Sequence, residues 1–283
     1  SSRCCQHNHA QGWPYFTEHL VLATPDNGVA IAIYAACKAT VKVGDGKEIT
    51  LHEETNYPFE EDIAFTVSTG EKVAFPFYLR IPSWTQKAEV RVNGKKVSAA
   101  PVAGKYLCIN REWANGDRVE LTLPMSLSMR TWQVNKNSVS VDYGPLTLSL
   151  KIAEKYVEKD SRETAIGDSK WQKGADSKKW PTTEIYPDSP WNYSLVLDKK
   201  EPLKNFKVIR KSWPADNYPF TVTSVPLEVK AIGRPVPEWK IDETGLCGVL
   251  PEEDAVKGDK EEITLIPMGA ARLRISAFPN TKE

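Results

Sequence analysis

Short segments in which apolar and polar residues alternate dominate this 283-residue sequence. A period of two is typical of strands that bury one face, and turns rich in glycine and asparagine separate the segments. Seven short strands at this spacing predict an antiparallel β-sandwich over residues 25–125. The predicted strands are 28–34, 39–43, 47–51, 62–67, 72–81, 88–92 and 118–123.

A second group of alternating segments follows a boundary near Met125 and predicts a second antiparallel β-sandwich over residues 126–283. Its strands are predicted at 138–143, 144–150, 193–197, 206–209, 220–223, 227–232, 263–266 and 272–278. Between them, residues 154–193 form a long polar loop, of a length that usually serves function or covers a neighbouring domain. The tryptophans of this loop could stack on sugar rings, but anchoring the loop is the more common role. They are Trp171, Trp180 and Trp191.

Only residues 11–23 show a convincing helical spacing of apolar side chains. Proline is tolerated in the first turn of a helix, so the helix either begins near Pro14 or is kinked there after an earlier turn around Asn8. The predicted apolar face consists of Trp13, Phe16, Leu20 and Ala23.

Charge and hydropathy exclude some classes of partner. Lysine plus arginine and aspartate plus glutamate number 37 each, so no net field draws the chain to nucleic acid or an anionic membrane. The longest apolar run, residues 29–37, is too short to span a bilayer. The chain opens on Ser1 with no methionine and no signal-type segment, so we expect that any targeting sequence was removed or never present, and localisation is not readable.

The densest reactive chemistry lies in Cys4-Cys5-Gln6-His7-Asn8-His9. A thiolate is a nucleophile and a soft metal ligand, and imidazole is the commonest nitrogen ligand. A helix beginning just after the thiols would lower their pKa. Adjacent cysteines alone have no metal-binding spacing, so the residues by themselves favour an exposed or disulfide-bonded pair, although Cys4, Cys5, His7 and His9 could also form a zinc site.

The other candidate residues are interpreted as structural. Five scattered cysteines argue against a disulfide framework. Three of them lie in apolar surroundings and are predicted to be buried, namely Cys37, Cys108 and Cys247. An acidic cluster is predicted to be the solvated edge of a loop, and comprises Glu53, Glu54, Glu60, Glu61 and Asp62. We also expect structural roles for His19 and His52.

Several motifs, taken in order, resemble glycoside hydrolase family 127, whose characterised members are β-L-arabinofuranosidases. In that family an (α/α)6 barrel precedes two β-sandwich domains, and adjacent cysteines end the barrel. The resemblance therefore implies that residues 1–24 are the C-terminal helix of a catalytic barrel whose remainder is missing. The matching motifs are Cys4-Cys5 with Asn8, Leu79-Arg-Ile-Pro-Ser-Trp84, Val90-Arg-Val-Asn-Gly94, Arg111-Glu-Trp113, Gly116-Asp117, Leu121-Thr-Leu-Pro-Met125, Tyr143-Gly-Pro-Leu146, Ile266-Pro-Met-Gly and Leu273-Arg-Ile.

The resemblance implies a retaining hydrolysis of arabinofuranosyl-type glycans. Cys4 would be the nucleophile and a zinc ligand, and Cys5 a second ligand. A glutamate and a cysteine that complete the zinc site, and the acid/base glutamate, would come from the upstream barrel, so the isolated chain should be inactive. Gln6-His7-Asn8-His9 stands where the characterised enzymes carry prolines. The alternatives are a non-catalytic β-sandwich module that binds carbohydrate or braces a partner domain, and a structural zinc protein.

Overall fold

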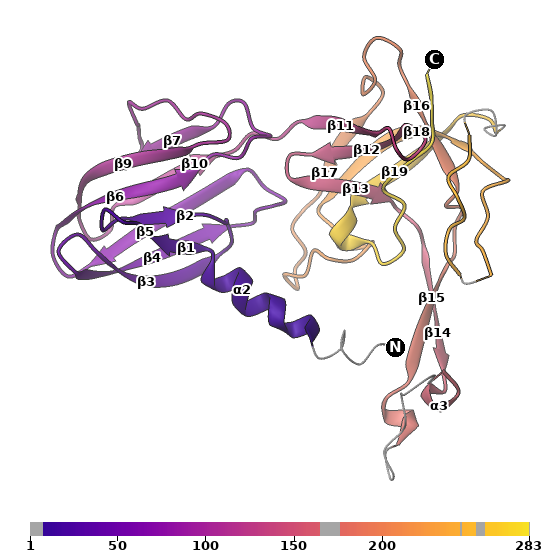
Figure 1. Cartoon of the computed structure of the whole chain (residues 1–283), viewed down its shortest axis with the longest axis horizontal. Coiled ribbons are helices and arrows are strands. Elements are labelled where there is room, and N and C mark those ends of the chain that lie inside the picture. The colour runs from indigo at the N-terminus through magenta and orange to yellow at the C-terminus, as the bar shows by residue number, and fades with distance from the viewer. Residues whose placement is uncertain (1–7, 165–175, 244, 253–257, 283) are drawn as a thin grey trace. The chain divides into compact units, whose positions relative to one another are not determined.

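The structure is a computed structural model that describes residues 8–164, 176–243, 245–252 and 258–282 (Figure 1). The protein is mainly β, with 46% strand and 7% helix. Its described helices are all too short or too polar to cross a membrane. The chain divides into two compact units, Ser2–Ser126 and Leu127–Glu283.

Two sheets make up the unit Ser2–Ser126. The four-stranded sheet has the order β1 (Val21–Ala23), β2 (Val29–Ile31), β6 (Val73–Arg80) and β9 (Tyr106–Trp113). The six-stranded sheet has the order β3 (Cys37–Val43), β4 (Lys47–Thr55), β5 (Asp62–Thr69), β10 (Arg118–Thr122), β7 (Glu89–Val92) and β8 (Lys95–Lys96).

Alternate residues of both sheets meet in one hydrophobic core. In β6 the residues at every second position are buried, among them Phe75 and Phe77, as the period of two predicts. Trp113 is fully buried between these rings, with centroid distances of 5.7 Å and 5.6 Å, and its Nε1 donates a hydrogen bond to the Phe75 carbonyl at 3.0 Å. The satisfied indole N–H lets this large side chain be buried without an unpaired polar atom.

The unit Leu127–Glu283 contains an eight-stranded sheet and a two-stranded ribbon. The sheet has the order β11 (Leu127–Trp132), β12 (Ser138–Tyr143), β13 (Leu146–Leu150), β19 (Glu261–Pro267), β18 (Leu227–Pro235), β16 (Tyr193–Leu197) and β20 (Asn280–Lys282), and β17 (Lys207–Arg210) also pairs with β18. The ribbon joins β14 (Glu154–Lys159) to β15 (Thr182–Pro187) (Figure 1). The short helices of this unit are α3 (Ser161–Thr164), η2 (Ser177–Lys179) and η4 (Met268–Ala270).

Residues near position 280 complete the eight-stranded sheet. Val139 and Phe278 exchange two backbone hydrogen bonds of 2.9 Å, and the side chain of Asn280 donates to the Asn137 carbonyl at 3.0 Å. β20 then runs alongside β16, with Leu195 opposite Asn280. The last described residues are therefore part of the sheet rather than a tail.

The predicted helix over residues 11–23 is wrong in its second half. A 3₁₀ turn, η1 (His9–Gln11), leads into α2 (Gly12–Glu18), and β1 follows at once. The Leu20 carbonyl accepts a hydrogen bond from Ala32 N at 3.0 Å, and β1 pairs with β2, so tertiary pairing overrides the helical spacing. Pro14 lies in the first turn of α2, which confirms the alternative that the helix begins near Pro14.

The predicted strands also need correction. β9 lies in a stretch with no predicted strand, and the segments 220–223 and 272–278 form no strand. Part of the predicted loop 154–193 is the β14–β15 ribbon. The sheets are not purely antiparallel, because β2 pairs in parallel with β6, and β16 with β20. A parallel pair requires a long crossover, and residues 32–72 and 198–279 provide it.

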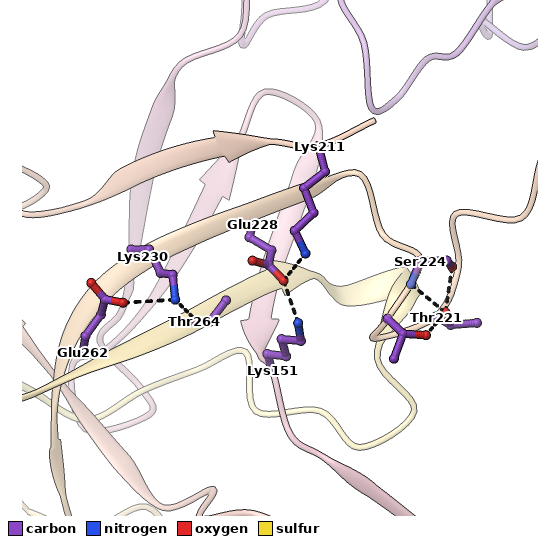
Figure 2. Close-up of polar contacts among 9 residues, drawn as sticks. Lys151, Lys211, Thr221, Ser224, Glu228, Lys230, Glu262 and Thr264 are labelled. Atoms are coloured by element: carbon purple, nitrogen blue, oxygen red, sulfur yellow. Dashed lines mark hydrogen bonds and ion pairs between the residues drawn. The ribbon is translucent and has the colours of Figure 1, made fainter. Parts of the chain in front are cut away.

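One carboxylate on the sheet of Leu127–Glu283 binds two lysines. Figure 2 shows Lys151 and Lys211 reaching the same oxygen of Glu228, with Nζ–Oε1 distances of 2.6 Å and 2.5 Å. The Glu228 side chain is 9% exposed. Its burial alone would raise its pKa, but the hydrogen bonds from both lysines outweigh that effect and hold the pKa of Glu228 below its usual value.

Glu228→Gln should lower the free energy of unfolding by about 1–3 kcal/mol at pH 7, because two ammonium groups would remain close together without a counter-charge. Because the pKa of Glu228 is lower in the folded state than its unfolded value of 4.5, the ionised carboxylate stabilises the folded protein at pH values above 4.5. This stabilisation is lost as the pH falls through the folded-state pKa. Urea unfolding at pH 7 and at acidic pH measures both effects. Glu262→Gln is the matched control, since Glu262 also pairs with a lysine but is 61% exposed; an equal loss in both variants would contradict the prediction.

Candidate functional site

The predicted nucleophile and zinc ligands, Cys4 and Cys5, lie outside the described residues, as does His7. Within residues 8–164, 176–243, 245–252 and 258–282, no group of three or more His, Cys, Asp or Glu side chains could hold a metal ion. The described part of the chain therefore supplies no metal centre of its own. The assignments of Cys4 and Cys5 stay predictions.

The helix that follows the cysteine pair buries none of its side chains. In α2 the side chains of Trp13 and Tyr15 are 64% and 65% exposed, and Phe16 is 38% exposed. Trp13 and Phe16 contact each other edge to face, with centroids 6.3 Å apart. The helix ends where His19 Nδ1 lies 2.6 Å from the Tyr15 carbonyl, which is the structural role expected for this histidine. α2 begins at Gly12, and the positions directly after the thiols lie outside the described residues, so the lowering of the thiol pKa stays a prediction.

A buried carboxyl group lies elsewhere, on β4. Glu53 is 1% exposed; its Oε1 accepts a hydrogen bond from Ala35 N at 3.0 Å, and its Oε2 lies 3.8 Å from Cys37 Sγ. Burial raises the pKa of Glu53 to about 8, and the two hydrogen bonds offset this only in part. The pKa of the Cys37 thiol is raised to about 11, mainly by burial and to a smaller extent by the nearby Glu53. Near neutral pH this pair is therefore a carboxylic acid beside a thiol.

Glu53 contradicts the prediction that the acidic cluster is a solvated loop edge. Ile49, Leu51 and Glu53 occupy alternate positions of β4, so all three point into the core. That alternation is visible in the sequence and could have identified the residue. Because Glu53 is closed off from solvent, we assign it no role toward an external substrate.

Two other residues of the acidic cluster, Glu61 and Glu54, differ in their surroundings. The Glu61 carboxylate accepts a hydrogen bond from Met125 N at 3.0 Å. Glu54 is 55% exposed and lies 3.5 Å from Arg118, which fits the solvated edge that was expected.

The predicted burial of the cysteines is wrong for two of them. Cys37 is half-buried, whereas Cys108 and Cys247 are exposed. In β9 the inward position belongs to Leu107, so the next residue, Cys108, points outward despite its apolar neighbours.

The loop tryptophans differ from one another. Trp191 is anchored, as predicted, by an edge-to-face contact with Trp239 at 5.2 Å between centroids. Trp180 is 71% exposed, so the anchoring prediction is wrong there. Trp171 lies outside the described residues.

A comparison with protein-family models found a match, which runs from the start of β2 almost to the end of the unit Ser2–Ser126. Residues 28–125 match the model described as the beta-L-arabinofuranosidase, GH127 middle domain. The resemblance to family GH127 is confirmed. The GH127 middle-domain match covers the two sheets of Ser2–Ser126 except for β1, and leaves out η1 and α2. The chain has no match among curated proteins.

Solved structures resemble nearly the whole chain. A GH127 β-L-arabinofuranosidase from Geobacillus stearothermophilus T6 is 21% identical with a TM-score of 0.62, and the match covers 98% of this chain and 37% of that protein. A protein described as a glycoside hydrolase is 20% identical with a TM-score of 0.64, and the match covers 99% of this chain and 40% of that protein. A GH127 beta-arabinofuranosidase is 22% identical with a TM-score of 0.64, covering 98% and 38%. Similarity at this identity shows a shared fold, and this chain spans about two-fifths of the length of those structures.

Proposed function

We propose that this chain is the C-terminal part of a retaining glycoside hydrolase that acts on arabinofuranosyl-type glycans. The observation that carries the proposal is the match of residues 28–125 to the GH127 middle domain, with the pair Cys4-Cys5 in the segment before it. The solved GH127 structures that resemble the chain over 98% of its length support the same assignment. In this proposal both units are accessory β-sandwich domains.

The exposed aromatic side chains of α2 support an upstream partner domain. A short surface helix normally buries one apolar stripe, and α2 leaves Trp13, Tyr15 and Phe16 uncovered by the described residues. We propose that α2 ends an (α/α)6 barrel and that these rings pack against it. A helix of seven residues is too short to be stable alone, so such packing would also hold it in place.

In the proposed reaction the Cys4 thiolate attacks the anomeric carbon, so that a carbon–sulfur bond forms as the glycosidic carbon–oxygen bond breaks. A glutamate of the upstream barrel protonates the leaving oxygen and then takes a proton from the water that hydrolyses the thioglycoside. Covalent catalysis by this route retains the anomeric configuration.

By the family resemblance, Cys4 and Cys5 would supply two of the four ligands of a tetrahedral zinc site, and the described residues contain no cluster that could complete it. The glutamate and cysteine expected upstream would supply the other two ligands. A zinc ion held there would keep both thiols deprotonated at neutral pH. Cys4 and Cys5 are therefore the residues of this chain that we propose as zinc ligands.

The proposal is tested by comparing this chain with a longer protein that includes the upstream domain. Hydrolysis of p-nitrophenyl β-L-arabinofuranoside should occur with the longer protein and be undetectable with the 283 residues alone, since in this proposal the acid/base glutamate belongs to the upstream barrel. Circular dichroism should show that the 283-residue chain is folded β protein in the same buffer. Turnover by the short chain would overturn the fragment proposal, and no turnover of arabinofuranosides by the longer protein would overturn the activity.

A further inference from the structure

A groove of about 540 Å³ lies within the unit Leu127–Glu283. One wall is the end of β15 with Glu184 and Tyr186, and Trp191 follows it in the chain. The other side is formed by residues 245–247 and by the segment that carries Arg272 and Arg274. The groove thus combines an aromatic surface with charged side chains, which is the combination that small polar ligands require.

The aromatic part of the groove is held rigidly. Trp191 packs edge to face on Trp239, with centroids 5.2 Å apart and planes at 64°. Trp239 is 3% exposed, and its Nε1 donates a hydrogen bond to the Gly248 carbonyl at 2.9 Å. Tyr186 is 45% exposed, and its hydroxyl donates to Glu184. A fixed aromatic face is suited to the apolar C–H face of a sugar ring, because its negative π surface attracts the weakly positive C–H groups at little entropic cost.

The two arginines differ in their partners. Arg272 is tied to the carboxylate of Glu154: its backbone N donates at 3.0 Å and its Nη1 lies at 3.5 Å. Its guanidinium also lies 6.0 Å from the centre of the Tyr156 ring. Arg274 Nε donates to the Ala271 carbonyl at 2.8 Å, and within the described part of the chain Arg274 has no carboxylate partner. Arg274 therefore lines the groove with a guanidinium whose charge is not neutralised.

Among the charged groups of the lining, Arg272 is paired with Glu154 and Glu184 lies 3.9 Å from Lys159, so Arg274 is the charge that remains for a ligand. A guanidinium recognises a carboxylate through two parallel hydrogen bonds. We propose that this groove binds a uronic acid residue of an acidic oligosaccharide, with the sugar ring against Trp191 and the carboxylate on Arg274. This inference goes beyond the proposed hydrolysis, because it needs neither Cys4 nor an upstream domain.

Calorimetric titration of the 283-residue protein with α-1,4-linked trigalacturonate tests the proposal. The fully methyl-esterified trisaccharide is the matched ligand, since it keeps the ring faces and removes the negative charge. We expect binding of the acid and at least about 10-fold weaker binding of the ester, as expected for the loss of a charged hydrogen bond. No binding of trigalacturonate, or equal affinity for acid and ester, would overturn the proposal.

A pair of arginine variants locates the site. Arg274→Gln should weaken trigalacturonate binding about 10-fold or more and leave the affinity for the ester unchanged. Arg162→Gln is the control, because Arg162 is an exposed arginine of the same unit that lies in α3 and does not line the groove. Thermal unfolding of both variants establishes that they are folded. If Arg274→Gln binds the acid as tightly as Arg162→Gln does, the assignment of the carboxylate to Arg274 is wrong.

Discussion

Glu53→Gln is expected to raise the free energy of unfolding by about 5 kcal/mol at pH 9 and to leave it nearly unchanged at pH 4. The folded-state pKa of Glu53 is about 8, against an ordinary value of 4.5. A carboxyl group whose pKa is raised by folding destabilises the folded state progressively as the pH rises from the unfolded value to the folded one. Glutamine stays neutral throughout and still offers an oxygen to Ala35 N.

Chemical unfolding measured between pH 4 and pH 9 tests this expectation. The unmodified protein should lose stability between pH 4.5 and pH 8 relative to the variant, with the difference constant above that range. Glu54→Gln is the control from the adjacent position, because Glu54 is 55% exposed and should change stability by less than about 0.5 kcal/mol. A Glu53→Gln variant that is no more stable than the original at pH 9 would contradict the prediction, because it would show that burial does not destabilise the ionised carboxylate.

Cys4→Ala, made in a protein that includes the upstream domain, is expected to lower kcat on an arabinofuranoside by at least about 10³-fold, since the proposed covalent intermediate cannot form. Cys5→Ala should release the bound zinc, measured by elemental analysis. An electrophilic arabinofuranose analogue should modify the peptide that contains Cys4 and should fail to modify it in Cys4→Ala. This labelling separates a nucleophilic role from a purely structural one.

Cys108→Ser is the matched control, because Cys108 is an exposed thiol on β9 and has no part in the proposed reaction. It should retain activity and zinc. Activity of Cys4→Ala within a few-fold of the original would remove Cys4 from the mechanism, whatever the zinc content.

Much of the fold could be predicted from the period of two. The strand predicted at residues 72–81 is β6 within two residues, and alternate residues of β6 are buried. β9 was missed because the run Asn110, Arg111 and Glu112 breaks the alternation, although Leu107 and Trp113 point inward. β1 was assigned to a helix because Leu20 and Ala23 fit a helical spacing, and local spacing carries no information on the partner strand β2.

The candidate sites were less accessible to sequence reasoning. The role of Cys4 and Cys5 rests on a family resemblance, since two adjacent thiols have no spacing that defines a metal site. Glu53 could have been found by extending the strand predicted at 47–51 by two residues, which places it on the inward face. The groove could not have been found, because Glu184, Trp191 and Arg274 come from separate segments that only the fold brings together.

The pairing of residues 278–282 with β12 and β16 has a consequence for synthesis of the protein. The bridge from Val139 to Phe278 and the pairing of β16 with β20 cannot form until residues 278–282 have left the ribosome, whereas every strand of Ser2–Ser126 is available once residue 126 has been made. The first unit can therefore fold during translation, but the eight-stranded sheet is completed only after translation of its last strand. In the interval the edge of β16 that β20 later covers is open to non-native strand pairing.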